Sequence, residues 1–230
     1  MAEPKDGQIG VKDGWIVDMS GIAGGEAGKP FQVAKVTDFT HLTEPDGTVY
    51  PHLLADALTA LALVLGLGAD KDKALAALKQ FTPGGHRIQT VAVAKTSDGG
   101  TIRFVDDSKA TNAHAAKASL DSFADKSVVW IAGGTDKGND YEPLKAFARE
   151  KVHTLVCMGI DNRKLVESFT GIIPEIISTD SLDAAMQAAR KASRPGDVVL
   201  LSPACASFDL FKNYENRGEL FKQWVAEHAK

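Results

Sequence analysis

Residues 105–112 of the chain read Val-Asp-Asp-Ser-Lys-Ala-Thr-Asn and join a strand-like segment to a helix-like segment. Upstream, residues 101–105 alternate polar and apolar side chains, as a half-buried strand does. Downstream, apolar side chains recur at helical spacing between Ala113 and Phe123. The stretch is therefore predicted to be a strand-to-helix turn. In open α/β sheets such turns border the crevice where ligands bind, and the helix N-terminus offers unpaired N–H groups to an anion.

A purely structural interpretation of the same stretch is that Ser108 or Thr111 caps the helix and that the charged side chains are solvated. A cap needs only one such residue, whereas the stretch contains six polar or charged ones. We therefore predict ligand binding at this turn in addition to capping.

The composition limits the class of protein. The chain has 230 residues, of which 44% are hydrophobic, so it can bury the core of one large or two modest domains. Lys and Arg total 26 against 30 Asp and Glu, without a basic run, which argues against a nucleic-acid partner. Two cysteines without a CxxC pattern favour a reduced, cytoplasmic setting. No secretory signal is recognisable, and residues 53–67 are too few for a membrane span, so no membrane association is expected.

The first eighty or so residues are predicted to form a small α+β region. Residues 8–11 and 15–19 flank an Asp-Gly pair, which predicts a β-hairpin. The glycine-rich loop 21–30 contains Gly28-Lys29, but Ala23 and Pro30 break the P-loop pattern, so a surface loop is predicted. The remaining predicted elements are a strand over 31–39, a turn over 44–47, a buried helix over 53–67 and a helix over 71–81.

A domain boundary is predicted at Thr82-Pro83-Gly84-Gly85, which suits neither a helix nor an interior strand. We assign residues 1–85 to a first domain and residues 86–230 to a second. Strands and helices alternate in the second, which predicts an α/β fold with a mostly parallel sheet flanked by helices. Further strands are predicted over 127–132, 154–158, 175–178 and 198–201, and helices over 142–150, 163–169, 182–192 and 219–227.

Polar residues follow four of these strands, and the carboxyl ends of parallel strands share one edge of a sheet. The segments are 106–112, 133–138, 159–162 and 202–209, with Asn213, Tyr214 and Arg217 beyond the last. Glycines at 133, 134 and 138 allow the backbone to approach a ligand and to turn around Lys137. None of these segments has the GxGxxG pattern of nicotinamide-binding proteins. Lysines, hydroxyls and backbone amides at one edge suit a small dianionic ligand.

Four motifs resemble those of the C-terminal half of the Mur ligases. They are His86-Arg87, the run from Asp107 to Asn112, Gly133-Gly134 with Lys137-Gly138, and the run from Leu201 to Asp209 with Phe211 and Arg217-Gly218. Their order and spacing agree over residues 53–230 and are most similar to the members that add D-glutamate. The resemblance implies a Rossmann-like C-terminal domain over 86–230, preceded by the C-terminal part of an ATP-binding α/β central domain over 1–85.

The activity implied by this resemblance is an ATP-dependent, amide-bond-forming ligation in cytoplasmic peptidoglycan synthesis. ATP phosphorylates the alanyl carboxylate of UDP-N-acetylmuramoyl-L-alanine, and the amine of D-glutamate attacks the acyl phosphate and releases phosphate. Such chemistry depends mainly on positioning and on neutralising phosphate charge. The implied partners are these three small molecules, the implied metal cofactor is Mg²⁺, and the implied oligomeric state is a monomer.

The resemblance also implies roles for single residues. Lys109 would be the catalytic residue, near the meeting point of the two ligands. The implied D-glutamate ligands are Thr111, Lys137, Ser207, Phe208 and Tyr214, and the implied ATP contacts are Arg87, Asp107 and Asp56. The shared strand-end edge independently indicates Thr111, Lys137 and Ser207 as anion-binding residues.

Some positions depart from the family's pattern. Asp56 stands where a second Asn helps to hold adenine, Gln89 where an acidic residue commonly follows His-Arg, and Asp106 where Asn often precedes Asp-Ser-Lys. The family's P-loop, magnesium-binding acid, carbamoylated lysine and UDP-binding domain have no counterpart in this sequence. We therefore expect a C-terminal fragment that binds D-glutamate but does not catalyse ligation alone, with the metal ligands outside it.

Alternatives remain for the whole chain and for single residues. Another Mur or folylpolyglutamate-type amide ligase would share the fold, and a stand-alone, non-catalytic binding module would share the motifs. A nucleophilic role of Cys205 is disfavoured because no His lies near it in the sequence. Asp106 and Asp107 form an acid/base couple or a metal site in one interpretation, but we expect Asp106 to be solvated or capping. Asp136 is expected to form a surface ion pair with Lys137.

Overall fold

The structure is a computed structural model that describes residues 3–43, 47 and 49–229. The chain divides into two units, Met1–Pro83 and Gly84–Lys230, and this division lies within the stretch 82–85. Each unit has its own sheet and is described by itself. The turn predicted over residues 44–47 lies, apart from Gly47, outside the described residues.

The first unit begins with the predicted hairpin. Strands β1 (Ile9–Lys12) and β2 (Trp15–Asp18) pair antiparallel, and β3 (Phe31–Lys35) adds to β2. Asp13 and Gly14 both have positive φ, 51° and 76°, as a two-residue hairpin turn of type I′ requires. The Asp-Gly pair thus determines the hairpin locally.

The strand predicted over residues 31–39 ends early, at Lys35. Two 3₁₀ turns follow it, η1 (Val36–Asp38) and η2 (Thr40–Leu42). Val36, Phe39 and Leu42 are all buried in one cluster. A spacing of three residues brings side chains to the same side of a 3₁₀ turn, whereas a strand would point them alternately to opposite faces.

Two helices complete the first unit, α1 (Pro51–Gly66) and α2 (Lys71–Gln80). Pro51 begins α1, where the missing N–H costs nothing. Asp70 caps α2 by accepting a hydrogen bond from the Lys73 N–H at 2.9 Å. Leu54, Leu58 and Leu61 of α1 are buried in the cluster that also contains Ile16 and Phe39.

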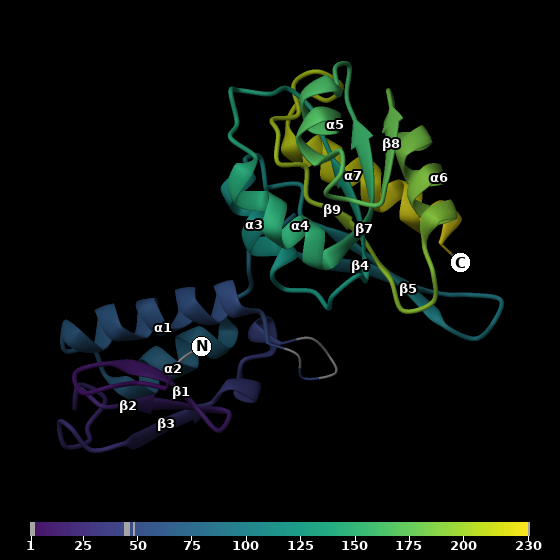
Figure 1. The fold of residues 1–230 in the computed structure, drawn as a ribbon. Helices are drawn as coiled ribbons and strands as arrows, with labels where there is room; N and C mark the ends of the chain where they lie inside the picture. Colours follow the sequence, from purple (N-terminus) through teal and green to yellow (C-terminus); the bar gives the residue numbers. More distant parts are fainter. Residues whose placement is uncertain (1–2, 44–46, 48, 230) are drawn as a thin grey trace. The chain divides into compact units, whose positions relative to one another are not determined.

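A six-stranded sheet organises the second unit, and its strand order is β4-β5-β9-β6-β7-β8 (Figure 1). The strands are β4 (Gln89–Lys95), β5 (Thr101–Asp106), β6 (Val128–Ala132), β7 (Val152–Met158), β8 (Glu175–Thr179) and β9 (Val198–Leu201). All neighbours from β5 to β8 pair in parallel, and β4 pairs antiparallel with β5. The predicted mostly parallel α/β fold is confirmed.

Strand β4 was not among the predicted elements. Its inner positions include Ala92 and Ala94, which are weak β-formers, so the alternation in the sequence is faint. The strand forms because β5 supplies hydrogen-bonding partners along almost its whole length, from Gln89 opposite Asp106 to Lys95 opposite Thr101. Pairing, rather than propensity, therefore decides this element.

The helices of the second unit are close to the predicted ones. They are α3 (Ala113–Leu120), α4 (Lys145–Lys151), α5 (Arg163–Phe169), α6 (Leu182–Ala192) and α7 (Tyr214–His228). A 3₁₀ turn, η3 (Glu142–Leu144), precedes α4. Helix α7 begins five residues before the predicted start at 219, because Asn213 caps it by accepting the Asn216 N–H at 2.7 Å.

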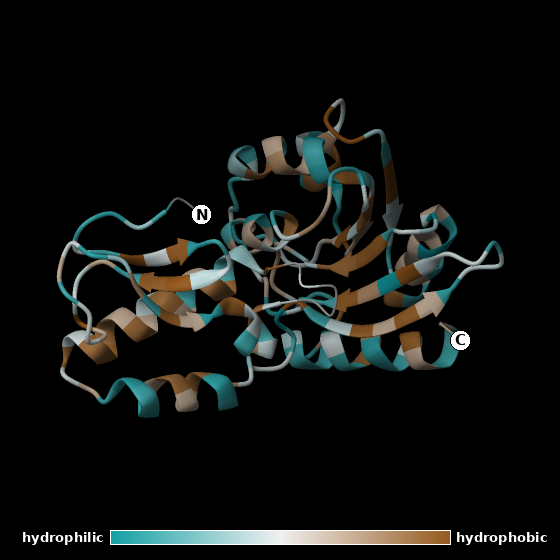
Figure 2. Cartoon of the chain, turned by 90° about the horizontal axis from the view of Figure 1, so that it is seen from below, coloured by the Kyte–Doolittle hydropathy of each residue, from teal (hydrophilic) through white to brown (hydrophobic). Residues whose placement is uncertain are grey.

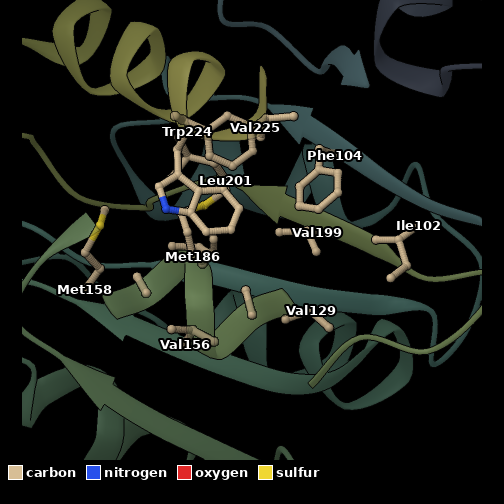
Figure 3. Close-up of a cluster of buried hydrophobic side chains, with 14 residues drawn as sticks. Ile102, Phe104, Val129, Val156, Met158, Met186, Val199, Leu201, Trp224 and Val225 are labelled. Carbon is tan, nitrogen blue, oxygen red and sulfur yellow. The ribbon is translucent and has the colours of Figure 1, made fainter. Parts of the chain in front are cut away.

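Helices α6 and α7 cover one face of the six-stranded sheet, and Figure 3 shows the resulting core. Trp224 and Val225 of α7 and Met186 of α6 pack against sheet residues such as Phe104 and Val199. The C-terminal helix alternates hydrophobic and hydrophilic residues along its length (Figure 2), as a helix with one buried face does. These contacts anchor α7, whose first turn reaches the functional site.

Helices α3, α4 and α5 lie on the other side of the sheet (Figure 1). On that side Trp130 is fully buried and meets Phe169 of α5 edge to face, with ring centroids 5.3 Å apart. The indole N–H donates to the Ser202 carbonyl oxygen at 2.7 Å, so no polar atom of this large side chain is left unpaired. Among the helices described, none is long and apolar enough to cross a bilayer.

Candidate functional site

Four loops leave the sheet at the carboxyl ends of β5, β6, β7 and β9, and we call them the rim loops. They comprise residues 107–112, 133–138, 159–162 and 202–209. The register aligns these ends, since Leu201 pairs with Asp106 of β5 and with Ile131 of β6. Loops from distant parts of the sequence therefore meet at one edge of the sheet, where ligands of open α/β sheets bind.

Backbone hydrogen bonds join the rim loops to one another. The Ala204 N–H donates to the Ala110 carbonyl at 2.9 Å, and the Gly133 N–H donates to the Pro203 carbonyl at 2.8 Å. Thr135 and Ala206 exchange two such bonds, at 2.9 and 3.2 Å. These bonds connect three of the rim loops, those that follow β5, β6 and β9.

Gly133 and Gly134 allow this close approach. Their φ angles are 133° and 127°, in the region that favours glycine. A Cβ atom on Gly133 would overlap the Met158 carbonyl oxygen, and one on Gly134 would overlap the Ala206 carbonyl oxygen. The two glycines are required by both backbone conformation and space, so their presence in the sequence motif has a structural cause.

Asp106 is neither solvated nor a helix cap, so that prediction was wrong. Its side chain is fully buried and lies 2.6 Å from Nδ1 of His86, with the Lys222 ammonium at 3.7 Å. Its other oxygen accepts the Ser108 N–H at 2.9 Å. The prediction failed because both partners, His86 and Lys222, are far from Asp106 in the sequence.

Asp107 is also buried, and among the described residues no positively charged group pairs with its carboxylate. It accepts hydrogen bonds from the Ser202 hydroxyl at 2.8 Å, from the Ser119 hydroxyl and from the Ile88 N–H at 3.2 Å. Burial raises the pKa of Asp107 to about 7, although these hydrogen bonds favour the ionised form and oppose the rise. A carboxyl group in this state can exchange a proton near neutral pH.

The cap of α3 is Asn112 and not Ser108 or Thr111, so the predicted caps were wrong. The Asn112 side chain accepts the Ala115 N–H at 2.9 Å. Ser108 instead donates its hydroxyl to the Tyr214 carbonyl at 2.8 Å and accepts from Arg217 Nε at 2.9 Å. Ser108 is therefore committed to the first turn of α7.

Arg217 is the central polar group beneath the rim. It is fully buried, and its guanidinium donates to the Ser108 carbonyl at 2.9 Å and to the Cys205 carbonyl at 3.3 and 3.4 Å. Burial lowers the pKa of Arg217 to about 10, although nearby acidic groups favour the charged guanidinium and oppose this shift. In the sequence Arg217 is recognisable only as a motif residue, and nothing local indicates that it is buried.

Residues 86–88 are clamped to the rim loop 107–112. The His86 carbonyl accepts the Lys109 N–H at 3.0 Å, while the Ile88 N–H is bound to Asp107. His86 and Ile88 have φ angles of 64° and 45°, which are strained for residues with large side chains. Arg87 lies between them and is exposed. The clamp thus holds Arg87 beside the start of the second unit's site.

Two lysines of the rim lie over aromatic rings. The Lys109 ammonium is 3.8 Å from the ring centroid of Tyr214, and the Lys137 ammonium is 5.4 Å from that of Phe208. Lys137 and Phe208 are exposed, and Lys109 and Tyr214 are half-buried. These contacts hold the ammonium groups at the surface without neutralising their charge.

The predicted ion pair between Asp136 and Lys137 is absent from the described contacts. Asp136 pairs with Lys164 of α5 at 2.7 Å and also accepts the N–H groups of Gly138 and Asn139, both at 2.8 Å. Partial burial opposes ionisation, but the Lys164 ammonium and the two N–H groups outweigh it and lower the pKa of Asp136. Asp136 therefore shapes the turn, and Lys137 keeps its charge available.

The other predicted site residues divide between the units. Thr111 is half-buried and Ser207 is 2% exposed, and both belong to rim loops. The structure therefore brings Lys109, Thr111, Lys137 and Ser207 to one edge. Asp56 lies in the first unit, on the exposed side of α1.

Cys205 does not have the surroundings of a nucleophile. Its sulfur is buried and lies 3.0 Å from the Tyr141 hydroxyl, and burial raises the pKa of the thiol. Cys157 is likewise buried, and its pKa is raised to about 12. In residues 3–43, 47 and 49–229, no cluster of three or more His, Cys, Asp or Glu side chains could hold a metal ion.

The sequence and the fold of this chain are similar to those of known proteins. The protein-family model described as "Mur ligase, glutamate ligase domain" matches residues 86–205. UDP-N-acetylmuramoylalanine–D-glutamate ligase of Bifidobacterium adolescentis is 70% identical over 241 aligned positions, which cover 100% of this chain and 50% of the relative. The ligase of the same name from Bifidobacterium longum subsp. infantis is 54% identical, with 98% and 49% covered. The chain spans about half the length of these curated relatives.

The fold is similar to that of a pseudomurein peptide ligase type C from Methanothermus fervidus. The TM-score is 0.57 over 87% of this chain and 39% of that protein, at 15% identity. This likeness concerns the fold alone. Because the domain match over residues 86–205 covers more than half of the chain and contains three of the four rim loops and the first half of the last, the chain belongs to the Mur ligase family.

Proposed function

We propose that the chain provides the D-glutamate-binding part of an ATP-dependent ligase that adds D-glutamate to UDP-N-acetylmuramoyl-L-alanine in cytoplasmic peptidoglycan synthesis. The names of the relatives at 70% and 54% identity support the choice of reaction. The observation that carries the proposal is the edge of the sheet where Lys109, Thr111, Lys137 and Ser207 come together.

The two carboxylates of D-glutamate require separate anion-binding groups. We assign one to the Lys137 ammonium, which is exposed and lacks a carboxylate partner among the described contacts. The other is assigned to the hydroxyls of Thr111 and Ser207, with Phe208 and the backbone of Tyr214 completing the site. Charge-assisted hydrogen bonds of this kind are stronger than neutral ones, so Lys137 should contribute most to affinity.

ATP is the second proposed ligand. The exposed Arg87 guanidinium suits phosphate, and the clamp of residues 86–88 would keep it in place. Asp107 is 5% exposed and already accepts three hydrogen bonds, so a ribose hydroxyl would have to replace one of its serine donors. Asp56 is proposed for adenine and Lys109 for the meeting point of the two ligands.

Mg²⁺ belongs to the proposed reaction, but the described residues provide no cluster that suits it. We therefore assign no step to a metal held by this chain. The chain is proposed to bind D-glutamate as a monomer and to form no amide product from UDP-N-acetylmuramoyl-L-alanine, ATP and D-glutamate when supplied alone. Product formation by the chain alone would contradict this part of the proposal.

Calorimetric titration of the chain with D-glutamate tests the function, with L-glutamate and meso-diaminopimelate as controls. Binding of D-glutamate alone is expected, and Lys137→Ala should weaken it by about 10-fold to 100-fold, the loss of one charge-assisted contact worth about 1.5–3 kcal/mol. Lys145→Ala is the matched control, since Lys145 lies in α4 and pairs with Glu142 at 2.7 Å. Preference for diaminopimelate would indicate a sibling amide ligase and overturn the assignment.

A further inference from the structure

The side chain of Asp209 lies where the loop after β9 meets the loop after β7. One carboxylate oxygen accepts the N–H of Ile160, in the loop after β7, at 3.2 Å. The other accepts the N–H of Leu210 at 2.9 Å, which fixes the orientation of the carboxylate. Asp209 itself ends the loop that follows β9. A single side chain therefore links the loop after β9 to the loop after β7.

Gly159 shows how tight this junction is. A Cβ atom on Gly159 would lie 3.0 Å from the Asp209 carboxylate oxygen and 3.1 Å from the nitrogen of Gly134. The φ angle of Gly159 is not in the left-handed region, so a larger residue here would be opposed by crowding and not by backbone conformation. Because Gly134 belongs to the loop after β6, all three loops touch at this point.

The junction is formed by residues close in the sequence to those that we assign to D-glutamate. Lys137 follows Gly134 by three residues, and Ser207 precedes Asp209 by two. The loop after β6 has a second attachment to this region, since Asp136 pairs with Lys164 of α5, the helix that follows Ile160. The separation of the Lys137 ammonium and the Ser207 hydroxyl thus depends on how closely the three loops are held.

A carboxylate so close to the proposed site is expected to weaken the binding of an anionic ligand. The proposed ligand carries two negative charges, and an acidic side chain two residues from Ser207 would repel it. The Asp209 carboxylate instead accepts two backbone N–H groups, that of its neighbour Leu210 and that of Ile160 in the loop after β7. Its charge therefore strengthens the bond that joins two loops. The expected role of Asp209 is therefore geometric.

We propose that Asp209 is a positioning residue of the D-glutamate site: it ties the loop after β9 to the loop after β7, against which the loop after β6 packs at Gly134, and so sets the distance between Lys137 and Ser207. This inference rests on the proposed function. Gly159 is part of the same junction, because an added Cβ would crowd the Asp209 carboxylate and the backbone nitrogen of Gly134.

The test uses Asp209→Ala, Asp209→Asn and Gly159→Ala in the full chain, with Asp180→Ala as a matched control that removes an exposed carboxylate after β8. Amide hydrogen exchange without ligand is the first measurement. Asp209→Ala and Gly159→Ala should speed exchange at Ile160 and in residues 133–138, while Asp209→Asn, which keeps an oxygen for the Ile160 N–H, should change it less.

Calorimetric affinity for D-glutamate is the second measurement. Asp209→Ala and Gly159→Ala should each raise the Kd by about 10-fold to 100-fold, as a displaced binding group does, and Asp209→Asn should recover part of the loss. Both substitutions open the same junction, so their effects should not add. The Kd of the double variant Gly159→Ala/Asp209→Ala should be no higher than that of the single variant that binds D-glutamate less tightly.

The outcomes separate this inference from the proposed function. Absence of D-glutamate binding by the wild-type chain would overturn the proposed function. Wild-type binding with unchanged Kd in Asp209→Ala and Gly159→Ala would overturn only the positioning role. If Asp209→Ala fails to fold, Gly159→Ala and Asp209→Asn decide the question by the same two measurements. An equal loss in the Asp180→Ala control would also overturn the role, because it would indicate an unspecific effect of charge.

Discussion

Replacing Asp107 with Asn should stabilise the second unit at neutral pH and change its stability little near pH 4. Burial raises the pKa of Asp107 from 3.8 to about 7. Between these values the folded protein keeps a proton that the unfolded chain has released, so the free energy of unfolding falls as the pH rises. At about 1.4 kcal/mol per pKa unit, the whole interval corresponds to about 4 kcal/mol. Asn avoids this loss because it does not ionise, and the hydroxyls of Ser119 and Ser202 can accept from its amide.

Urea unfolding between pH 4 and pH 8 measures this effect. The fluorescence of Trp130 and Trp224 reports on the second unit, and Trp15→Phe removes the signal of the first. The stability advantage of Asp107→Asn over the wild type should grow by about 4 kcal/mol across this range. Asp121→Asn, an exposed position at the end of α3, should show no such growth. An advantage that stays constant with pH, or a loss of stability at pH 8, would refute the burial of an unpaired carboxyl group.

The other predictions concern glycine, arginine and cysteine in the second unit. Gly133→Ala should destabilise it by about 3 kcal/mol, because the added Cβ overlaps a backbone oxygen. Gly138 has a φ of 81° but open space around it, so Gly138→Ala should cost only about 1 kcal/mol. Equal losses of the two variants in urea unfolding would contradict this. Arg217→Met should cost about 3–5 kcal/mol in the same assay, since it leaves buried carbonyl oxygens unpaired, and an unchanged midpoint would argue against its network. Cys157 and Cys205 are buried and their thiol pKa values are raised, so both should react with a thiol reagent at pH 8 only after unfolding. Fast labelling of the native chain would contradict their burial.

Local patterns were sufficient for most of the fold and for the edge that carries the site. The hairpin at Asp13-Gly14, the buried strands and the helix of residues 182–192 follow from turn chemistry and periodicity, which act over a few residues. The grouping of Thr111, Lys137 and Ser207 followed from one topological rule, that parallel strands end at the same edge. The roles of these residues toward ligands remain predictions.

The errors concerned residues whose partners are distant in the sequence. Asp106 was expected to be solvated, but it is buried against His86 and Lys222. Ser108 was expected to cap a helix, but its hydroxyl bonds the Tyr214 carbonyl and Arg217, more than a hundred residues later. A polar side chain looks the same in a sequence whether water or another side chain satisfies it, and only packing decides between the two.

The sequence by itself therefore determined most of the elements, their alternation, the parallel sheet and the family to which the chain belongs, because these depend on short-range patterns and on motifs. The tertiary structure alone decided the electrostatics of the site. It buried Asp107 away from any cation of the described residues and thereby raised its pKa, and it brought Gly134, Gly159 and Asp209 together at one junction. Burial and the meeting of distant loops depend on how all the elements pack, and no local pattern of residues specifies that.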